Sequence, residues 1–177
     1  MGALTRMAAT GPMMDPEVDQ QRQYLTFSLG GDMFALGILN IKEIIEYGNI
    51  TDVPMMPASI RGVINLRGAV VPVVDLLARF GRDASPVTKR SCIVIIEVGQ
   101  ADGRQDIGVV VDSVSEVLEI GAADIEPPPS FGARIRANYI QGMGKVDQKF
   151  VIILNADEVL SIEDLERAGE IAHGIEA

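Results

Sequence analysis

An internal repeat limits the folds that this 177-residue chain can adopt. The segment 34–47 aligns with 107–120, and the segment 60–75 aligns with 140–155. The matched residues include Glu43 with Glu116, Ile44 with Val117, Gly62 with Gly142, and Asp75 with Asn155. Because any two β-hairpins share some apolar alternation, chance similarity is the alternative to duplication. Duplication predicts two similar subdomains, at about 24–90 and 91–160.

Short segments rich in apolar residues and bounded by glycines predict that most of the chain is β-structure. A hairpin turn is expected at Gly30, Gly31 and Asp32. The segment 39–47 has helical spacing instead and predicts a short helix or turn, and Ser161 predicts the start of a short helix within a C-terminal tail, 161–177. Many strands without a βαβ rhythm are typical of antiparallel barrels. The predicted strands are 23–29, 33–38, 62–66, 69–74, 91–98, 106–112, 115–120, 139–146 and 149–155.

Charge and composition narrow the range of partners. The chain has 15 Lys and Arg against 25 Asp and Glu, a formal charge of -10, which does not suit the phosphate backbone of a nucleic acid. No apolar run approaches the roughly 20 residues that span a bilayer. Residues 1–22 lack the apolar core of a signal peptide and predict a flexible tail. The single cysteine, Cys92, fits a reducing cytoplasm.

The sequence carries no recognisable catalytic or metal-binding constellation. Its one histidine, His173, lies near the C-terminus, whereas a zinc site needs several Cys or His residues. The carboxylate pairs Glu43/Glu46 and Glu116/Glu119 could serve as acid and base, but a solvated polar face is the preferred interpretation. We therefore expect a binding module without a cofactor or metal, and an enzyme that uses the paired glutamates is the remote alternative.

The most specific pattern lies in the segment 60–81, IRGVINLRGAVVPVVDLLARFG. Together with segments 24–36, 41–45, 107–120 and 139–160, it makes the chain resemble the family of CheW-like domains over residues 23–160. This family includes chemotaxis coupling proteins and the regulatory domain of the chemotaxis histidine kinase. Since 177 residues leave no room for the other kinase domains, the stand-alone adaptor is favoured. The residues that match the family pattern are Gly62, Asn65, Leu66, Arg67, Gly68, Pro72, Asp75 and Leu76.

The resemblance implies an all-β fold of two intertwined five-stranded barrels of the SH3/OB-like kind. It also implies a non-catalytic adaptor that joins the cytoplasmic tips of chemoreceptors to the regulatory domain of the chemotaxis histidine kinase. Such an adaptor is cytoplasmic, lies at the membrane-associated receptor array and does not insert into the membrane. The alternative is a CheW-like module of another two-component pathway, such as surface motility or development.

The resemblance further assigns residues to binding surfaces. Arg67, at a predicted hairpin turn, can bond a carboxylate or a helix C-terminus of the receptor, and an internal ion pair with Asp75 is the alternative, although both can hold. Phe131, after three prolines, is expected in the contact that joins adaptors and kinases into rings, unless it folds back onto the second barrel. The apolar residues Ile38 and Leu39 are candidates for the kinase contact. The receptor-facing surface comprises Arg67, Ile41, Glu43, Ile44, Gly62 and Cys92.

Three other residues of the motif are expected to have structural roles. Asn65 is predicted to cap the turn before Arg67. Pro72 is predicted at an edge position, because proline cannot donate to a strand ladder. Asp75 is predicted to cap a helix that follows its strand.

Overall fold

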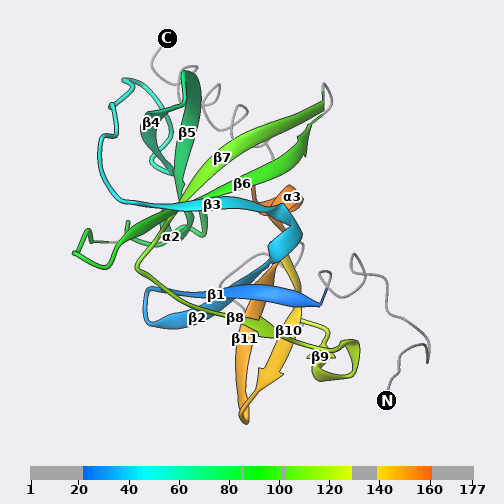
Figure 1. The fold of residues 1–177 in the computed structure, drawn as a ribbon. Helices are drawn as coiled ribbons and strands as arrows, with labels where there is room; N and C mark the ends of the chain where they lie inside the picture. The colour runs from blue at the N-terminus through cyan, green and yellow to red at the C-terminus, as the bar shows by residue number, and fades with distance from the viewer. Residues whose placement is uncertain (1–21, 85, 101–102, 129–138, 161–177) are drawn as a thin grey trace.

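Two β-sheets contain most of the regular structure in the computed structural model, which describes residues 22–84, 86–100, 103–128 and 139–160 (Figure 1). Sheet A has the strand order β8-β1-β2-β11-β10-β9, and sheet B has the order β3-β6-β7-β5-β4. The all-β prediction is confirmed, with β9 as a short sixth strand of sheet A. The elements are β1 (Gln23–Leu29), β2 (Asp32–Gly37), η1 (Ile38–Asn40), β3 (Ile41–Glu46), β4 (Ile60–Leu66), β5 (Ala69–Asp75), α2 (Leu76–Arg79), β6 (Cys92–Gln100), β7 (Gly103–Val111), β8 (Ser113–Glu119), η2 (Ala122–Asp124), β9 (Ile125–Glu126), β10 (Ile140–Val146), β11 (Lys149–Leu154) and α3 (Ala156–Val159).

Each sheet combines strands from both sequence repeats. In sheet A, β1 and β2 of the first repeat pair with β8 and β11 of the second. In sheet B, β6 and β7 of the second repeat pair with β3 and β5 of the first. The registers agree with the repeat, since Ala35 pairs with Ile153 in one sheet and Gly108 with Val73 in the other. A division at residue 90 therefore separates the repeats, whereas each sheet is built from both of them.

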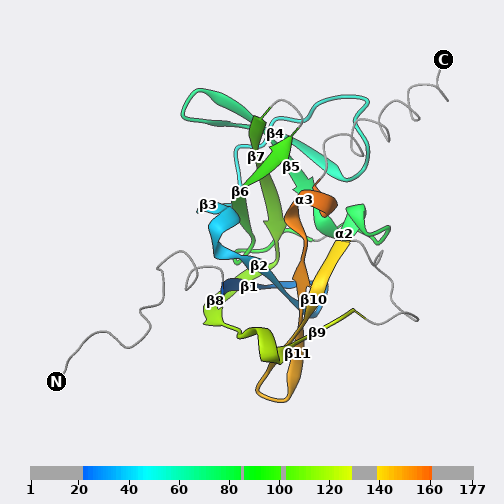
Figure 2. The same ribbon diagram turned by 90° about the vertical axis from the view of Figure 1, so that its right-hand side faces the viewer.

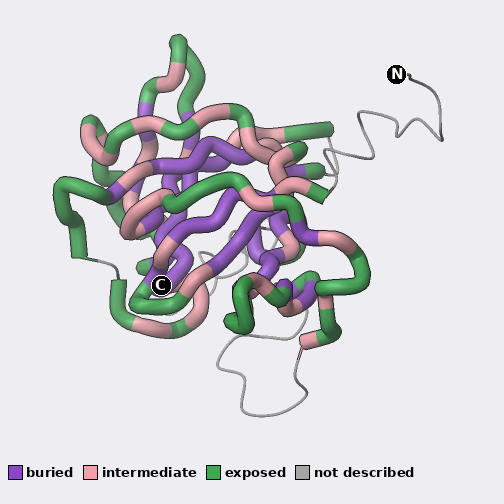
Figure 3. Tube along the Cα trace, turned by 60° about the horizontal axis from the view of Figure 1, so that its bottom comes forward, coloured by how far each residue is buried: buried purple, intermediate pink, exposed green. Residues whose placement is uncertain are grey.

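The main apolar core lies between the two sheets, which are stacked with α2 and α3 near their junction (Figures 1 and 2). Each sheet also encloses a smaller core of its own. Buried strands fill the centre of the molecule, and exposed loops surround them (Figure 3). Fully buried residues include Phe27, Phe34, Val94 and Ile96 between the sheets, Val73 and Ile95 in sheet B, and Ala35 and Ile153 in sheet A.

The prediction of a helix or turn over 39–47 is wrong for most of that segment. After the single turn η1, residues 41–46 form β3, which pairs antiparallel with β6. A bulge between Ile41 and Glu43 interrupts the pairing and places an extra residue in β3. Ile41 and Ile44 therefore reach the same face although they are three residues apart, and this spacing resembles that of a helix. The tails and the helix expected from Ser161 lie outside the described residues.

The predicted edge position of Pro72 is confirmed at the residue, although the strand as a whole is internal to its sheet. Its strand, β5, lies between β4 and β7 in sheet B. The pairing with β7 begins at Val73, so the proline directly precedes the part of β5 that has neighbours on both sides. Proline is tolerated there because no ladder bond to β7 has begun.

Candidate partner-binding surface

The outer strand β3 presents different residues on its two faces. Ile41 and Ile44 lie opposite Ile96 and Val94 of β6, which belong to the core between the sheets. Ile44 is nevertheless 43% exposed, because β3 lies at the margin of that core. Glu43 lies opposite Ile95 of β6, which belongs to the smaller core of sheet B, so Glu43 is on the other face of β3. The face of β3 that carries Ile41 and Ile44 therefore offers an apolar strip to a partner.

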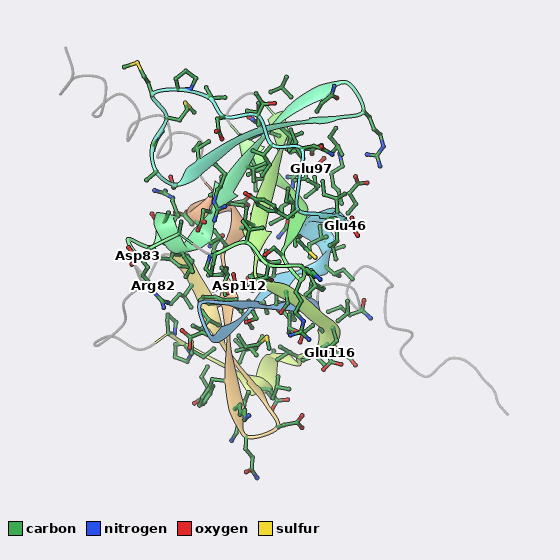
Figure 4. The ribbon with its side chains drawn as sticks, turned by 90° about the vertical axis from the view of Figure 1, so that its left-hand side faces the viewer. Glu46, Arg82, Asp83, Glu97, Asp112 and Glu116 are labelled. Carbon is green, nitrogen blue, oxygen red and sulfur yellow. The ribbon has the colours of Figure 1, made fainter. Side chains whose placement is uncertain are left out.

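The predicted carboxylate pair Glu43/Glu46 receives no support as a catalytic site. Glu43 lies opposite Ile95, in the core of sheet B, whereas Glu46 lies opposite Cys92, which packs against the core between the sheets. The two carboxylates thus leave opposite faces of β3 and cannot share a reacting atom. Glu46 and Glu116, from β3 and β8, lie on the same side of the molecule (Figure 4). Within the described ranges, no group of three His, Cys, Asp or Glu residues could hold a metal ion.

Arg67 lies at the tip of the β4–β5 hairpin, as the sequence predicts. Arg67 and Gly68 both have positive φ angles, 53° and 87°, and Asn65 Oδ1 accepts a hydrogen bond of 2.8 Å from the Gly68 N–H. This geometry suits a two-residue hairpin turn and confirms the capping role of Asn65. The Arg67 side chain is 73% exposed, and its Nη2 donates to Glu43 Oε2 over 2.5 Å. This hydrogen bond and the charge of Glu43 raise the pKa of Arg67.

An internal ion pair with Asp75 was the alternative role for Arg67. Asp75 does form such an ion pair, but with Arg61. Asp75 is fully buried, and its Oδ2 accepts hydrogen bonds from Nε and Nη2 of Arg61 at 3.0 and 2.7 Å. Asp75 Oδ1 also accepts from the Ala78 N–H at 3.1 Å, which confirms the predicted cap of α2. Burial by itself lowers the pKa of Arg61, but the hydrogen bond and charge of Asp75 outweigh it and raise that pKa.

The role of Arg61 was not predicted from the sequence, although a signal was present. Asp75 follows an apolar strand, and a buried carboxylate requires a cation or several hydrogen bonds. Several arginines, among them Arg61, Arg67 and Arg79, were near enough in sequence to supply that cation. Pairing in the β4–β5 hairpin places Ile60 opposite Val74, so Arg61 lies at the same end of the hairpin as Asp75 and Arg67 lies at the other end.

Gly62 is buried on β4 against the loop that follows β3. Its φ angle of 147° falls in a region that residues with a side chain rarely adopt. A Cβ atom there would overlap the carbonyl oxygen of Thr51 and approach Ile50 Cγ2 to 2.8 Å. These contacts give Gly62 a structural reason to be glycine, and any contact with a partner must involve the loop that packs over it.

The remaining predicted residues lie around the same sheet or outside the described chain. Cys92 begins β6 directly opposite Glu46, beside the strip on β3. Ile38 and Leu39 belong to η1, and Leu39 is 49% exposed. Phe131 lies outside the described residues. The structure thus brings Arg67 to Glu43 and Cys92 to the end of β3, while Gly62 supports the opposite outer strand, β4.

Alkylation of Cys92 should report the environment of this surface. Burial, followed by the negative charge of Glu46, raises the pKa of the Cys92 thiol above its ordinary value of 9.0. We expect the rate of iodoacetamide modification, measured by mass spectrometry against pH, to have its midpoint at a higher pH in the native chain than in the denatured chain. Glu46→Gln should move the midpoint to lower pH, since it removes the negative charge. A native midpoint at or below that of the denatured chain would contradict the geometry.

Comparisons with known proteins add an independent finding. A family model described as CheW-like domain matches residues 23–164. The chain is 30% identical to the chemotaxis protein CheW of Klebsiella aerogenes, over 85% of this chain and 89% of that protein. It is 28% identical to the protein FrzA of Myxococcus xanthus, over 79% of this chain and 86% of that protein. The crystal structure of the scaffolding protein TtCheW from Thermoanaerobacter tengcongensis is similar with a TM-score of 0.71 and 35% identity, and the match covers 78% of this chain and 87% of that one.

Proposed function

Since the chain belongs to the family of CheW-like domains and is a non-catalytic coupling adaptor of chemotaxis signalling, we propose that it joins two particular partners. One is the cytoplasmic tip of a chemoreceptor, and the other is the regulatory domain of the chemotaxis histidine kinase. The adaptor would then lie at the membrane-associated receptor array through its partners. In the described part of the chain, no helix is long and apolar enough to cross a membrane.

The observation that supports the receptor surface best is the exposed ion pair between Arg67 and Glu43, which lies on the other face of β3 from the strip of Ile41 and Ile44. We propose that a receptor helix lies along the open edge of β3, where its apolar face contacts Ile41 and Ile44 and a carboxylate or its C-terminus is directed toward Arg67 on the other face. Cys92 lies at the end of the same strip. Gly62 contributes by supporting the loop after β3.

Two further contacts complete the proposal. Ile38 and Leu39, in the single turn between β2 and β3, are proposed for the kinase contact because Leu39 exposes half of its surface. Phe131 is proposed for the contact that joins adaptors and kinases into rings, because an aromatic side chain after three prolines is a suitable interface anchor. Both contacts would be weak individually and gain strength when many copies assemble.

A second candidate function rests on the similarity to FrzA. A CheW-like module of another two-component pathway would have the same fold and the same docking surfaces. The identity of the partners separates the two candidates, so binding to a chemoreceptor fragment and a chemotaxis kinase distinguishes them.

Arg67→Ala should weaken binding to a receptor cytoplasmic fragment by about tenfold or more, because it removes a charged hydrogen-bond donor from the surface. Binding to the kinase regulatory domain should remain unchanged. The melting temperature should change little, since the side chain is exposed and its ion pair with Glu43 is at the surface. The measurement is a titration of each partner separately, with a thermal melt of each variant.

Asp147→Ala is the matched control, because Asp147 occupies the corresponding turn of the β10–β11 hairpin and has a φ angle of 50°. The control carries the same backbone strain without changing the proposed receptor surface. Equal receptor affinity for Arg67→Ala and the unmodified chain would refute the role of Arg67. If the unmodified chain bound neither the receptor fragment nor the kinase regulatory domain, a role in another two-component pathway would be favoured.

A further inference from the structure

The two outer strands of sheet B, β3 and β4, are connected by side chains at the end of the sheet that is far from Arg67. The guanidinium of Arg61, on β4, is held by the buried carboxylate of Asp75. Its remaining nitrogen, Nη1, donates a hydrogen bond of 2.9 Å to the hydroxyl of Tyr47, the residue that follows β3. The same guanidinium lies 5.7 Å from the centre of the Tyr47 ring. We call Asp75, Arg61 and Tyr47 the polar latch.

Sheet A has no polar latch at the corresponding place. By the repeat, Tyr47 corresponds to Ile120, Arg61 to Gln141 and Asp75 to Asn155. Ile120 is 2% exposed in the core of sheet A, so it is held by apolar burial. Its N–H also donates to the Arg22 carbonyl over 2.9 Å, whereas the N–H of Tyr47 donates to the Ser91 carbonyl over 3.4 Å. The backbone of Tyr47 is therefore held by a longer hydrogen bond than that of Ile120, and the next backbone hydrogen bonds, to β4, come four residues later, between Thr51 and Val63.

β3 lies at the margin of sheet B, where ion pairs from Lys42 to Asp106 and from Glu43 to Arg67 also hold it. Its one neighbouring strand in sheet B is β6, and none of its six residues is buried. Strand edges of this kind open locally at a lower free energy than the core strands. A hydrogen bond from a charged guanidinium at the end of β3 is strong enough to change that local equilibrium.

We infer that Arg61 is a positioning residue, which Asp75 orients so that it fixes the end of β3 through Tyr47. The position of β3 then depends on the planar guanidinium of Arg61, which donates hydrogen bonds to the carboxylate of Asp75 and the hydroxyl of Tyr47 at the same time. The consequence for partner binding rests on the proposed function, because β3 carries Glu43 and Ile44. The latch itself does not depend on which partner binds.

Tyr47→Phe tests the inference most directly, because it removes the hydroxyl and leaves the ion pair between Arg61 and Asp75 in place. We expect amide hydrogen exchange in β3 to become about tenfold faster, since the lost bond involves a charged donor. Exchange in β8, the corresponding strand, should not change. Alkylation of Cys92, which lies opposite Glu46 at the end of β3, should become faster by a similar factor. Both rates are measured on the full chain under native conditions by mass spectrometry.

Two variants separate positioning from general stability. Tyr24→Phe removes a phenol hydroxyl from the core of sheet A and should leave exchange in β3 unchanged. Arg61→Lys keeps a positive charge for Asp75 but lacks the planar guanidinium that also reaches Tyr47. This variant should therefore be more stable than Arg61→Gln and should still show fast amide exchange in β3. Unchanged exchange of β3 in Tyr47→Phe, or an equal increase in β3 and β8, would overturn the inference. Faster exchange of β3 with unchanged affinity for a receptor fragment would support the latch and count against the proposed receptor surface.

Discussion

Arg61→Gln should lower the free energy of unfolding by about 3 to 5 kcal/mol, because it leaves the fully buried carboxylate of Asp75 without its cation. The guanidinium donates two hydrogen bonds to one oxygen of Asp75, and glutamine cannot replace both of them. The side chain of Arg61 is itself largely buried, so solvent does little to screen the pair. Chemical denaturation of the variant and of the unmodified chain, followed by circular dichroism, gives this difference.

The second repeat of the chain supplies the control for this prediction. Gln141 and Asn155 occupy the positions that correspond to Arg61 and Asp75. The double variant Arg61→Gln with Asp75→Asn copies this uncharged pair into the first repeat and should regain most of the lost stability. Asparagine can also replace aspartate as the cap of α2. A double variant as unstable as Arg61→Gln alone would show that the loss does not come from an unpaired buried charge.

Gly62→Ala should destabilise the fold by about 3 kcal/mol or more, because it adds strain in the backbone to a steric overlap. The φ angle of 147° disfavours any residue with a Cβ, and that atom would overlap the backbone carbonyl of Thr51. A backbone carbonyl cannot move aside as a flexible side chain can. The loop that follows β3 must therefore shift, and the free energy of unfolding from denaturant titration should show the loss.

Gly121→Ala is the matched control for the loss of a glycine. Gly121 has a φ angle of -73°, and no atom lies within 4 Å of the place where its Cβ would be. This variant should be as stable as the unmodified chain. If Gly62→Ala were equally stable but bound a receptor fragment more weakly, Gly62 would act through a partner contact and not through the fold.

The strand content could be predicted from the sequence because it depends on local patterns. Apolar segments between glycines predicted the strands of both sheets except β3 and β9, and the repeat of 34–47 in 107–120 corresponds to the related positions of β3 and β8. The helix or turn over 39–47 was predicted wrongly because a bulge is set by the partner strand. No local pattern in β3 reveals that one of its residues will have no residue opposite it in the pairing with β6.

The candidate surface could be predicted only in part. The motif placed Arg67 at a hairpin tip, because Asn65 and Gly68 form a recognisable turn. The partner of Arg67 was not predictable, since Glu43 lies 24 residues earlier on the strand at the other margin of sheet B. Arg61 was missed for the same reason, because its role depends on the pairing of β4 with β5 and on the return of the chain at Tyr47.

The sequence by itself determined that the chain is a duplicated β-protein with an acidic surface and a specific motif at one hairpin. These properties can be read from residue types and their order along the chain, because they do not depend on which strands become neighbours in the folded protein. Only the tertiary structure decided that each sheet takes strands from both repeats, and which arginine pairs with Asp75. Such choices depend on burial, because a carboxylate acquires a strict need for a cation only after the surrounding strands have removed it from water.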